Sequence, residues 1–571
     1  MTVAETKRIQ IGTYIFQRLA QVENLKSIFG VPGDFNLPFL EHIYNVPQLN
    51  WIGNCNELNA GYAADGYARI NGLGVLTTTF GVGELSALNA VSGAYVEGSP
   101  VLHIVGTSAT TAKRANNLGV HHLIPNKNTW DASQPHDVYE KMVAPFACVI
   151  EKLYDENMDT LQTQIDNAIE TVYKQSRPGY IFLPANMANM AMEYDPSKPL
   201  ELGKYFSNVS QAEDLAQKVL DKLYEKEFAV IADQWWKTRR APLNKFVKEN
   251  KLHCFSSYLG KSILDESNER FHGSVAGNLS CAGSREALQK FELAVHFGVV
   301  LNEMNNFGYW YPKDDVKEVI EVGKDFVRLD GELHTGVDGE AVFDFMMTKL
   351  DASKIKHDES LVLPGKPGVE QCQDKSKPVT QISLAATAEN YLRPNDVLVS
   401  EMCSFLFSTP DIKLPSGLTF ISQNYYGSIG FALPATLGAS LAVKDSGEDR
   451  RVILVEGDGS SQMTIQELSS MIKYDVKPTI LLLNNEGYSV ERVVLGPTRA
   501  YNDIQKNWKW TELFKTFGDV EGKSVSTRVD SVDALEEALG KDNDKLKFIE
   551  VGLEKLDVPW RFGFLCGKAK K

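Results

Sequence analysis

The first third of the chain alternates short, unbroken apolar runs with longer segments in which apolar residues recur at helical spacing. Unbroken runs of this length are typical of strands buried inside parallel sheets, and their alternation with helices is the βαβ pattern. Residues 57–69 and 84–95 are the two clearest helical segments. The expected strands cover residues 27–30, 75–80, 101–106 and 180–184. We therefore expect a parallel sheet covered by helices in this part of the chain.

The same pattern returns twice, after each of two polar segments. Residues 194–199 are rich in proline and charge, and residues 351–378 hold ten Asp, Glu or Lys against only five Val, Ile or Leu. Such segments cannot build a core and are expected to be connections. Further strands are expected at 229–232, 293–300, 397–400, 452–455 and 479–483. The pattern thus predicts an α/β protein of three doubly wound domains with parallel sheets, at 1–193, 205–355 and 379–571.

Charge and composition exclude several classes of function. Lys and Arg total 59 against 74 Asp and Glu, which gives a net charge of −15, so nucleic acid and anionic membranes are not expected partners. No apolar run approaches the roughly 18 residues of a membrane span, and the N-terminus has no signal-peptide core, which favours a cytoplasmic protein. The seven cysteines form no CxxC pair, so we expect free thiols.

The most informative segment lies in the third expected domain. Gly457-Asp458-Gly459 follows one apolar run, and after twenty-four further residues Asn484-Asn485 ends the next run. Neighbouring parallel strands end at the same edge of a sheet, so these groups should meet there. Asp458 would repel a bare phosphate but not a phosphate with Mg²⁺, and Asp458, Asn485 and the Gly487 carbonyl supply the oxygen ligands that Mg²⁺ prefers. A simple structural turn is the alternative; P-loop and GxGxxG motifs are absent.

This arrangement resembles the diphosphate-binding motif of thiamine diphosphate-dependent enzymes, and residues 54–69 closely resemble a segment of the 2-oxo acid decarboxylases among them. The resemblance implies thiamine diphosphate and Mg²⁺ as cofactors. It implies that Glu57 relays the proton that activates the cofactor, although a solvated Glu in a first helical turn would look the same. The implied cofactor-binding residues are Glu57, Ser404, Gly427, Ile429, Asp458, Gly459, Ser460, Asn485 and Gly487, with Asp458, Asn485 and Gly487 on the metal.

Two further segments resemble the decarboxylases, at residues 31–36 and 120–124. They imply that Asp34, His121 and His122 act in catalysis, together with Glu491 beside the substrate carboxylate. Paired histidines and an aspartate also form a reasonable proton network near neutral pH. The complete implied catalytic set is Asp34, Glu57, His121, His122 and Glu491.

The resemblance spans nearly the whole chain and names the three domains as pyrimidine-binding, middle and diphosphate-binding. It implies decarboxylation of a 2-oxo acid to an aldehyde and CO₂, by a homodimer or homotetramer with active sites between subunits. The segments 179–185, 296–306 and 496–503 most resemble those of the family members that act on phenylpyruvate, indolepyruvate and branched-chain 2-oxo acids in amino-acid catabolism, and this resemblance implies such substrates. A pyruvate decarboxylase of alcoholic fermentation, a catalytically weak thiamine diphosphate-sensing regulator and a carboligase remain alternatives.

The sequence departs from the family pattern in three places. Met402 and Cys403 replace a small hydroxyl residue and a glycine, which affects pocket volume and backbone geometry. Residues 233–237 lack the regulatory cysteine of yeast pyruvate decarboxylase, so cysteine-based substrate activation is not expected. The C-terminal residues 559–568 lack a clear helix to close the site.

Overall fold

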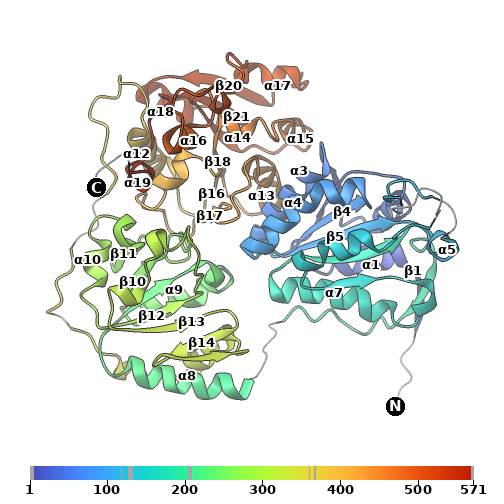
Figure 1. Cartoon of the computed structure of the whole chain (residues 1–571), viewed down its shortest axis with the longest axis horizontal. Coiled ribbons are helices and arrows are strands. Elements are labelled where there is room, and N and C mark those ends of the chain that lie inside the picture. Colours follow the sequence, from blue (N-terminus) through green and yellow to red (C-terminus); the bar gives the residue numbers. More distant parts are fainter. Residues whose placement is uncertain are drawn as a thin grey trace.

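The computed structural model describes residues 6–116, 119–125, 133–203, 209–358, 360–364 and 368–567. Within them the chain forms one two-stranded sheet and three larger sheets of six, seven and six strands, each larger sheet flanked by helices (Figure 1). Each larger sheet lies within one of the three expected domain ranges. The expected boundaries at residues 1, 205 and 571 lie outside the described residues, so the exact limits stay a prediction.

The N-terminal sheet has the strand order β3-β2-β4-β5-β7-β6, and all neighbouring pairs are parallel. Its strands are β2 (Ser27–Gly30), β3 (Asn50–Gly53), β4 (Gly74–Thr79), β5 (Val101–Thr107), β6 (Ile150–Lys152) and β7 (Gly179–Pro184). The helices of this domain include α1 (Ile11–Leu19), α3 (Glu57–Asn71), α4 (Val82–Glu97), α5 (Thr110–Ala115), α6 (Val138–Val143) and α7 (Leu161–Gln175). β1 (Lys7–Gln10) and β8 (Ala191–Tyr194) form the separate antiparallel pair.

The middle sheet corrects one expectation, because it is mixed rather than wholly parallel. Its order is β11-β10-β9-β12-β13-β14-β15, and the pairs β13–β14 and β14–β15 are antiparallel. Only three residues separate β13 from β14 and two separate β14 from β15, too few for the crossover that parallel strands need. The strands are β9 (Phe228–Ala232), β10 (His253–Ser256), β11 (Phe271–Ser274), β12 (Leu293–Phe297), β13 (Glu318–Val322), β14 (Phe326–Leu329) and β15 (Glu332–Thr335), and the main helices are α8 (Val209–Leu223), α9 (Arg240–Glu249), α10 (Ser284–Leu288) and α11 (Gly339–Lys349).

The C-terminal sheet is wholly parallel, in the order β17-β16-β18-β19-β21-β20. Its strands are β16 (Val397–Ser400), β17 (Thr419–Ile421), β18 (Val452–Gly457), β19 (Thr479–Asn484), β20 (Ser524–Val529) and β21 (Leu546–Gly552). Its helices include α12 (Gln381–Tyr391), α13 (Ala432–Ser446), α14 (Asp458–Ser461), α15 (Glu467–Lys473), α16 (Ser489–Val494), α17 (Leu513–Thr516), α18 (Val532–Gly540) and α19 (Trp560–Leu565).

In both outer sheets the strand order reverses at the strand that comes first in the chain, β2 in one and β16 in the other. β3 lies on one side of β2 and β4 on the other, and β17 and β18 flank β16 in the same way. Ligands of doubly wound sheets bind outside the carboxyl ends of the strands at such a reversal. The fold therefore provides one candidate crevice in the first domain and another in the third.

Helices α3 and α13 join the first and third domains through glycines. A Cβ atom on Gly66 would lie 2.1 Å from the backbone oxygen of Ala435, and one on Gly438 would lie 1.9 Å from the backbone oxygen of Ala63. Only glycine permits this approach of backbone to backbone. Buried residues of both domains consequently form one continuous core around the two helices.

The C-terminal segment forms a short helix, α19, where the sequence showed none clearly. Its Arg561 is fully buried and donates to the carbonyl oxygens of Leu279 and Phe407 at 2.8 and 2.9 Å. The same guanidinium pairs with both carboxylate oxygens of Asp411. One side chain thus ties the end of the described chain to the middle and third domains.

Candidate active site

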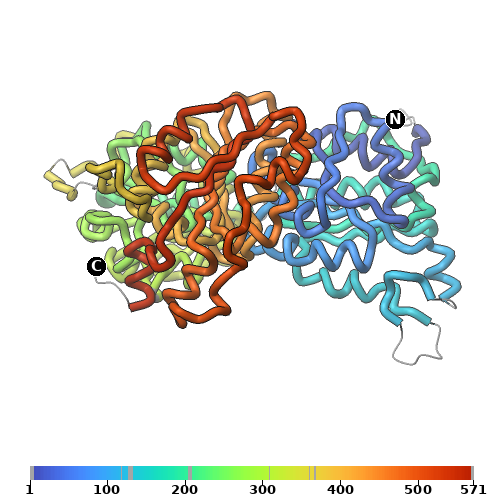
Figure 2. Tube along the Cα trace, turned by 90° about the horizontal axis from the view of Figure 1, so that it is seen from above, coloured from blue at the N-terminus to red at the C-terminus, as the bar shows by residue number. Residues whose placement is uncertain are grey.

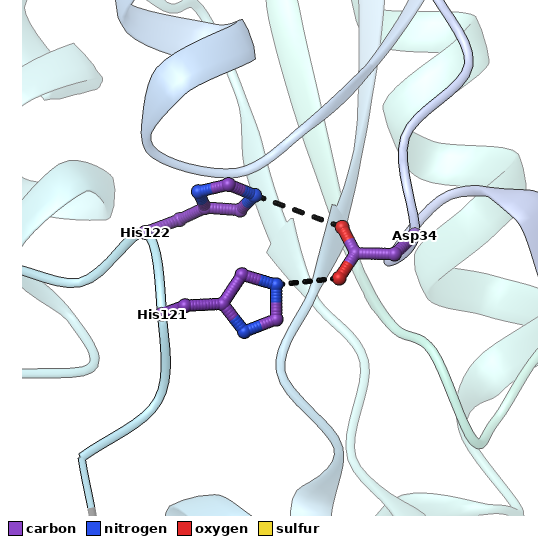
Figure 3. A group of neighbouring side chains, drawn as sticks. All are labelled: Asp34, His121 and His122. Atoms are coloured by element: carbon purple, nitrogen blue, oxygen red, sulfur yellow. Dashed lines mark hydrogen bonds and ion pairs between the residues drawn. The ribbon is translucent and has the colours of Figure 1, made fainter.

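Three side chains predicted from the sequence meet at the carboxyl end of β2 (Figure 3). The Nε2 atom of His121 lies 2.5 Å from Oδ2 of Asp34, and Nε2 of His122 lies 3.6 Å from Oδ1. All three remain open to solvent, with side-chain exposures of 51% for Asp34, 61% for His121 and 26% for His122. The cluster can therefore hold and pass a proton while it stays accessible to a small molecule.

The backbone at His122 is fixed by a hydrogen bond and by close packing around its carbonyl oxygen. Tyr139 donates its hydroxyl hydrogen to the backbone oxygen of His122 at 2.6 Å, and His122 itself has a φ of +72°. Gly81, just before α4, would place a Cβ atom 2.4 Å from the same oxygen. The Phe35 ring packs against His121 with 4.9 Å between ring centroids. The histidine pair is thus positioned by the start of α4 and by the turn after β2.

Glu57 begins α3 and is half-buried at the same edge of the N-terminal sheet. Its helix is capped by Asn56, whose side chain accepts the backbone N–H of Asn59 at 2.8 Å. One carboxylate oxygen of Glu57 lies 3.2 Å from the place where a Cβ atom on Gly83 would stand. Gly83 is two residues from Gly81, so Glu57 and His122 both lie against one short segment at the start of α4.

In the third domain, Asp458 occupies the first turn after β18 and is completely buried. Its carboxylate accepts the backbone N–H groups of Gly459 at 2.8 Å and Gly487 at 3.0 Å. Burial raises the pKa of Asp458 to about 7, and these hydrogen bonds together with the nearby Arg492 offset only part of that effect. A bound cation would stabilise the ionised form of this buried carboxylate.

Asn485 follows β19 and supplies the test of whether a metal fits. The end of its amide that faces inward lies 3.3 Å from Oδ1 of Asp458 and 2.7 Å from the carbonyl oxygen of Gly487. If this atom is the amide nitrogen, it donates a hydrogen bond to both oxygens. If it is the amide oxygen, it faces the oxygens of Asp458 and Gly487, and three oxygens together form the kind of ligand set that Mg²⁺ prefers. The residues predicted as metal ligands are therefore brought together with suitable chemistry.

Glycines shape this second cluster. Gly487 has a φ of +135°, and a Cβ atom there would lie 2.2 Å from the Asn502 carbonyl oxygen. A Cβ atom on Gly459 would lie 2.7 Å from the Tyr488 ring. The hydroxyl group of Ser460, in the same turn, donates to the carbonyl oxygen of Gly457 at 3.0 Å. A larger residue at Gly459 or Gly487 would therefore displace the turns after β18 and β19.

The segment with Gly427 and Ile429 is held by a buried carboxylate that the sequence interpretation did not single out. Glu401 accepts the backbone N–H groups of Gly430 and Ala432 at 3.2 and 2.9 Å. Burial raises the pKa of Glu401 to about 7. Gly427 adopts a φ of +66°, and Ile429 is half-buried. A glutamate directly after a buried strand was the available signal for this support.

Ser404 and Glu491 complete the predicted set. Ser404 lies just after β16, at the strand reversal, and accepts a hydrogen bond from Gln381 at 2.8 Å. Glu491 is exposed on α16, whereas its neighbour Arg492 is buried and was not predicted. Arg492 donates to the carbonyl oxygens of Asn485 and Glu486 at 2.9 and 2.6 Å. It therefore fixes the backbone on which the metal-ligand candidates lie.

The two clusters stay apart within one chain. Among the described residues, no hydrogen bond or ion pair links Asp34, Glu57 or the two histidines to the cluster around Asp458 and Asn485. The segment after α5, which carries the histidines, lies at the end of the molecule away from the C-terminal domain (Figure 2). Within the described part of one chain, the two clusters therefore share no direct polar contact.

Comparisons with known proteins agree on the same two outer domains. Residues 9–128 match a family described as the N-terminal TPP binding domain of thiamine pyrophosphate enzymes, and residues 405–551 match the C-terminal TPP binding domain. A transaminated amino acid decarboxylase of Saccharomyces cerevisiae is 38% identical, over 96% of this chain and 94% of the relative. A pyruvate decarboxylase of Kluyveromyces lactis is 35% identical over 96% of both chains, and isozyme 1 of S. cerevisiae is 34% identical.

One further observation concerns membranes. Within the residues that the structure describes, we find no helix that combines the length and the apolar character needed to cross a bilayer.

Proposed function

Because the chain belongs to the thiamine pyrophosphate-dependent decarboxylases, we propose that it converts larger 2-oxo acids to aldehydes and CO₂ in amino-acid catabolism. The observation that carries this proposal is the convergence of Asp458, Asn485 and the Gly487 carbonyl at the carboxyl ends of β18 and β19. These three groups would hold Mg²⁺, and the turn at Gly459 and Ser460 would receive the diphosphate. Ser404, Gly427 and Ile429 would contact the rest of the cofactor.

When bound, thiamine diphosphate supplies a nucleophilic carbon and an electron sink for the decarboxylation. The protein must therefore supply proton transfer and orientation. The carboxylate of Glu57 is half-buried and has no hydrogen-bond partner among the described residues, so it is available to hold a proton on the cofactor. Asp34, His121 and His122 form a second group of side chains that can accept and donate a proton, and it is suited to protonating the product carbon. We propose that Glu491, exposed on α16, orients the substrate carboxylate.

A preference for phenylpyruvate, indolepyruvate and branched-chain 2-oxo acids is supported by the likeness to the transaminated amino acid decarboxylase. Phe35, which packs on His121, and Val494, which is exposed on α16, are apolar side chains that could contact such a substrate, whereas Leu406 is fully buried in the core. Pyruvate decarboxylation is the second candidate, because three pyruvate decarboxylases are 34–35% identical over 96% of this chain. A thiamine diphosphate-sensing regulator is the third candidate, since Met402 and Cys403 depart from the family pattern.

The specificity constant kcat/KM should be measured for phenylpyruvate, indolepyruvate, 4-methyl-2-oxopentanoate and pyruvate at saturating thiamine diphosphate and Mg²⁺. We expect aldehyde release from all of the larger acids and a lower kcat/KM for pyruvate. A preference for pyruvate would favour the fermentative alternative. No aldehyde from any of the four acids would leave the regulator and the carboligase, and an assay for acetolactate formed from pyruvate would separate these two.

The separation of the two clusters leads to the proposal that the protein acts in the cytoplasm as a homodimer or homotetramer, with each active site shared between two chains. Mixing Glu57→Gln with Asp458→Asn protein tests this directly. In a mixed dimer one site carries both changes and the other carries neither, so random mixing should restore about a quarter of the wild-type activity. Sites built within one chain would show no recovery. Light scattering before and after subunit exchange provides the control for assembly.

A further inference from the structure

A large cavity lies where the three domains meet, outside the candidate active site. Its volume is about 900 Å³. Arg69 and Arg177 of the first domain and Trp235, Lys237 and Lys324 of the middle domain contribute to its lining. Arg177 and Lys324 each stack on the Trp235 ring, with 5.0 Å from the cation to the ring centroid. The cavity thus combines an aromatic wall with several cations.

Lys237 is the unusual group of this cavity. It lies in the 3-10 helix Gln234–Arg239, and its Nζ atom donates to the backbone carbonyl of Glu97 at 2.6 Å. Burial lowers the pKa of Lys237 to about 7, and the charges of Arg69 and Lys324 act in the same direction, against Glu97 and Asp65. A lysine of this kind is partly an uncharged amine at neutral pH and can act as a nucleophile.

Glu97 connects this lysine to the loop of the candidate cofactor site. Its Oε1 atom accepts the backbone N–H groups of Tyr425 and Tyr426 at 3.0 and 3.1 Å. Its Oε2 atom accepts the side-chain amide of Gln234 at 2.6 Å, next to the segment that carries Lys237. Tyr426 directly precedes Gly427. A change of the bond between Lys237 and Glu97 would therefore reach the backbone that holds the cofactor.

We propose that Lys237 is a reversible attachment site for aldehydes, through which the product of the reaction lowers the activity. The Nζ atom adds to the aldehyde carbon, and loss of one water leaves an imine, so no oxidant or further reactant is needed. Nζ gives up hydrogens in this step and weakens its bond to the Glu97 carbonyl. The organic group of the aldehyde would lie in the cavity beside Trp235. Only the choice of aldehyde as product rests on the proposed function.

The test traps the imine and does not depend on turnover. The holoenzyme is incubated with phenylacetaldehyde and cyanoborohydride at pH 7, digested, and analysed by mass spectrometry. We expect Lys237 to be labelled roughly tenfold or more above Lys245, which is 72% exposed on α9 of the same domain. Equal labelling of the two lysines would overturn the proposal even if decarboxylation is confirmed.

A variant of Lys237 tests whether attachment of an aldehyde lowers the activity. Lys237→Arg keeps a positive charge but removes the primary amine, so it should abolish labelling at this position and make turnover insensitive to added phenylacetaldehyde. Lys245→Arg is the matched control and should stay as sensitive as wild type. Inhibition by phenylacetaldehyde that persists unchanged in Lys237→Arg would overturn the feedback role.

Discussion

Replacing Glu57 by Gln is expected to lower kcat by roughly 10³-fold while thiamine diphosphate still binds. Glutamine has nearly the same shape but cannot hold the proton that the carboxylate is proposed to relay. The side chain lies at the start of α3 beside Gly83, far along the chain from the groups that would anchor the metal and the diphosphate. The change should therefore remove chemistry and spare most of the binding.

Two measurements check this prediction. Single-turnover and steady-state rates with phenylpyruvate report the loss of chemistry, and titration with thiamine diphosphate and Mg²⁺ reports the retained affinity. Glu41→Gln, an exposed position in the same domain, is the control and should behave as wild type. A rate near that of wild type for Glu57→Gln would show that another group relays the proton.

Asp458→Asn is expected to have the opposite effect to Glu57→Gln, because it should mainly weaken cofactor binding. The variant keeps the size of the side chain but removes the single anionic ligand of the proposed Mg²⁺ set, so the affinity should fall by about 100-fold or more. A ligand present at 100 times its Kd stabilises a protein by about 2.7 kcal/mol, and the variant should lose most of this gain at the same concentration. Calorimetric titration and thermal unfolding with and without cofactor measure both effects.

The pH dependence of wild-type binding provides a second check on Asp458. Burial raises its pKa to about 7, and Mg²⁺ binds only the ionised carboxylate. Affinity should hence be nearly constant above pH 8 and fall by up to about tenfold per unit below pH 7. Asp458→Asn should lack this slope, whereas Asp475→Asn, at an exposed position, should retain it. An unchanged affinity at pH 6 would contradict the assignment of Asp458 as a metal ligand.

Much of the fold was predictable because its strands are unbroken apolar runs. The strands at β4, β5 and β7 coincide closely with such runs, and the wholly parallel outer sheets confirm the α/β prediction. The hairpins β13–β14–β15 were not foreseen. Their sequences, EVIEV, FVRL and ELHT, mix apolar with polar and charged residues and contain no unbroken apolar run of the kind used to predict the other strands.

The candidate site likewise contains residues that the sequence predicted and residues that it did not. Asp458, Asn485 and Gly487 could be predicted because a strand end fixes where each of them lies. Glu401 and Arg492 could not be assigned a role, since both act on backbone groups far away in the chain or around a turn. The family, by contrast, was identified correctly from motifs quoted from both outer domains.

The glycine contact between α3 and α13 has a consequence for motion. With backbone touching backbone at Gly66 and Gly438, the first and third domains of one chain cannot slide past each other without a steric clash. A shared site that admits substrate and then excludes water must open by displacement of one chain against its partner, or by movement of the loops that carry the histidines and Glu491. For the proposed shared site, we therefore expect the opening motion at these loops or between chains, and not between the first and third domains of one chain.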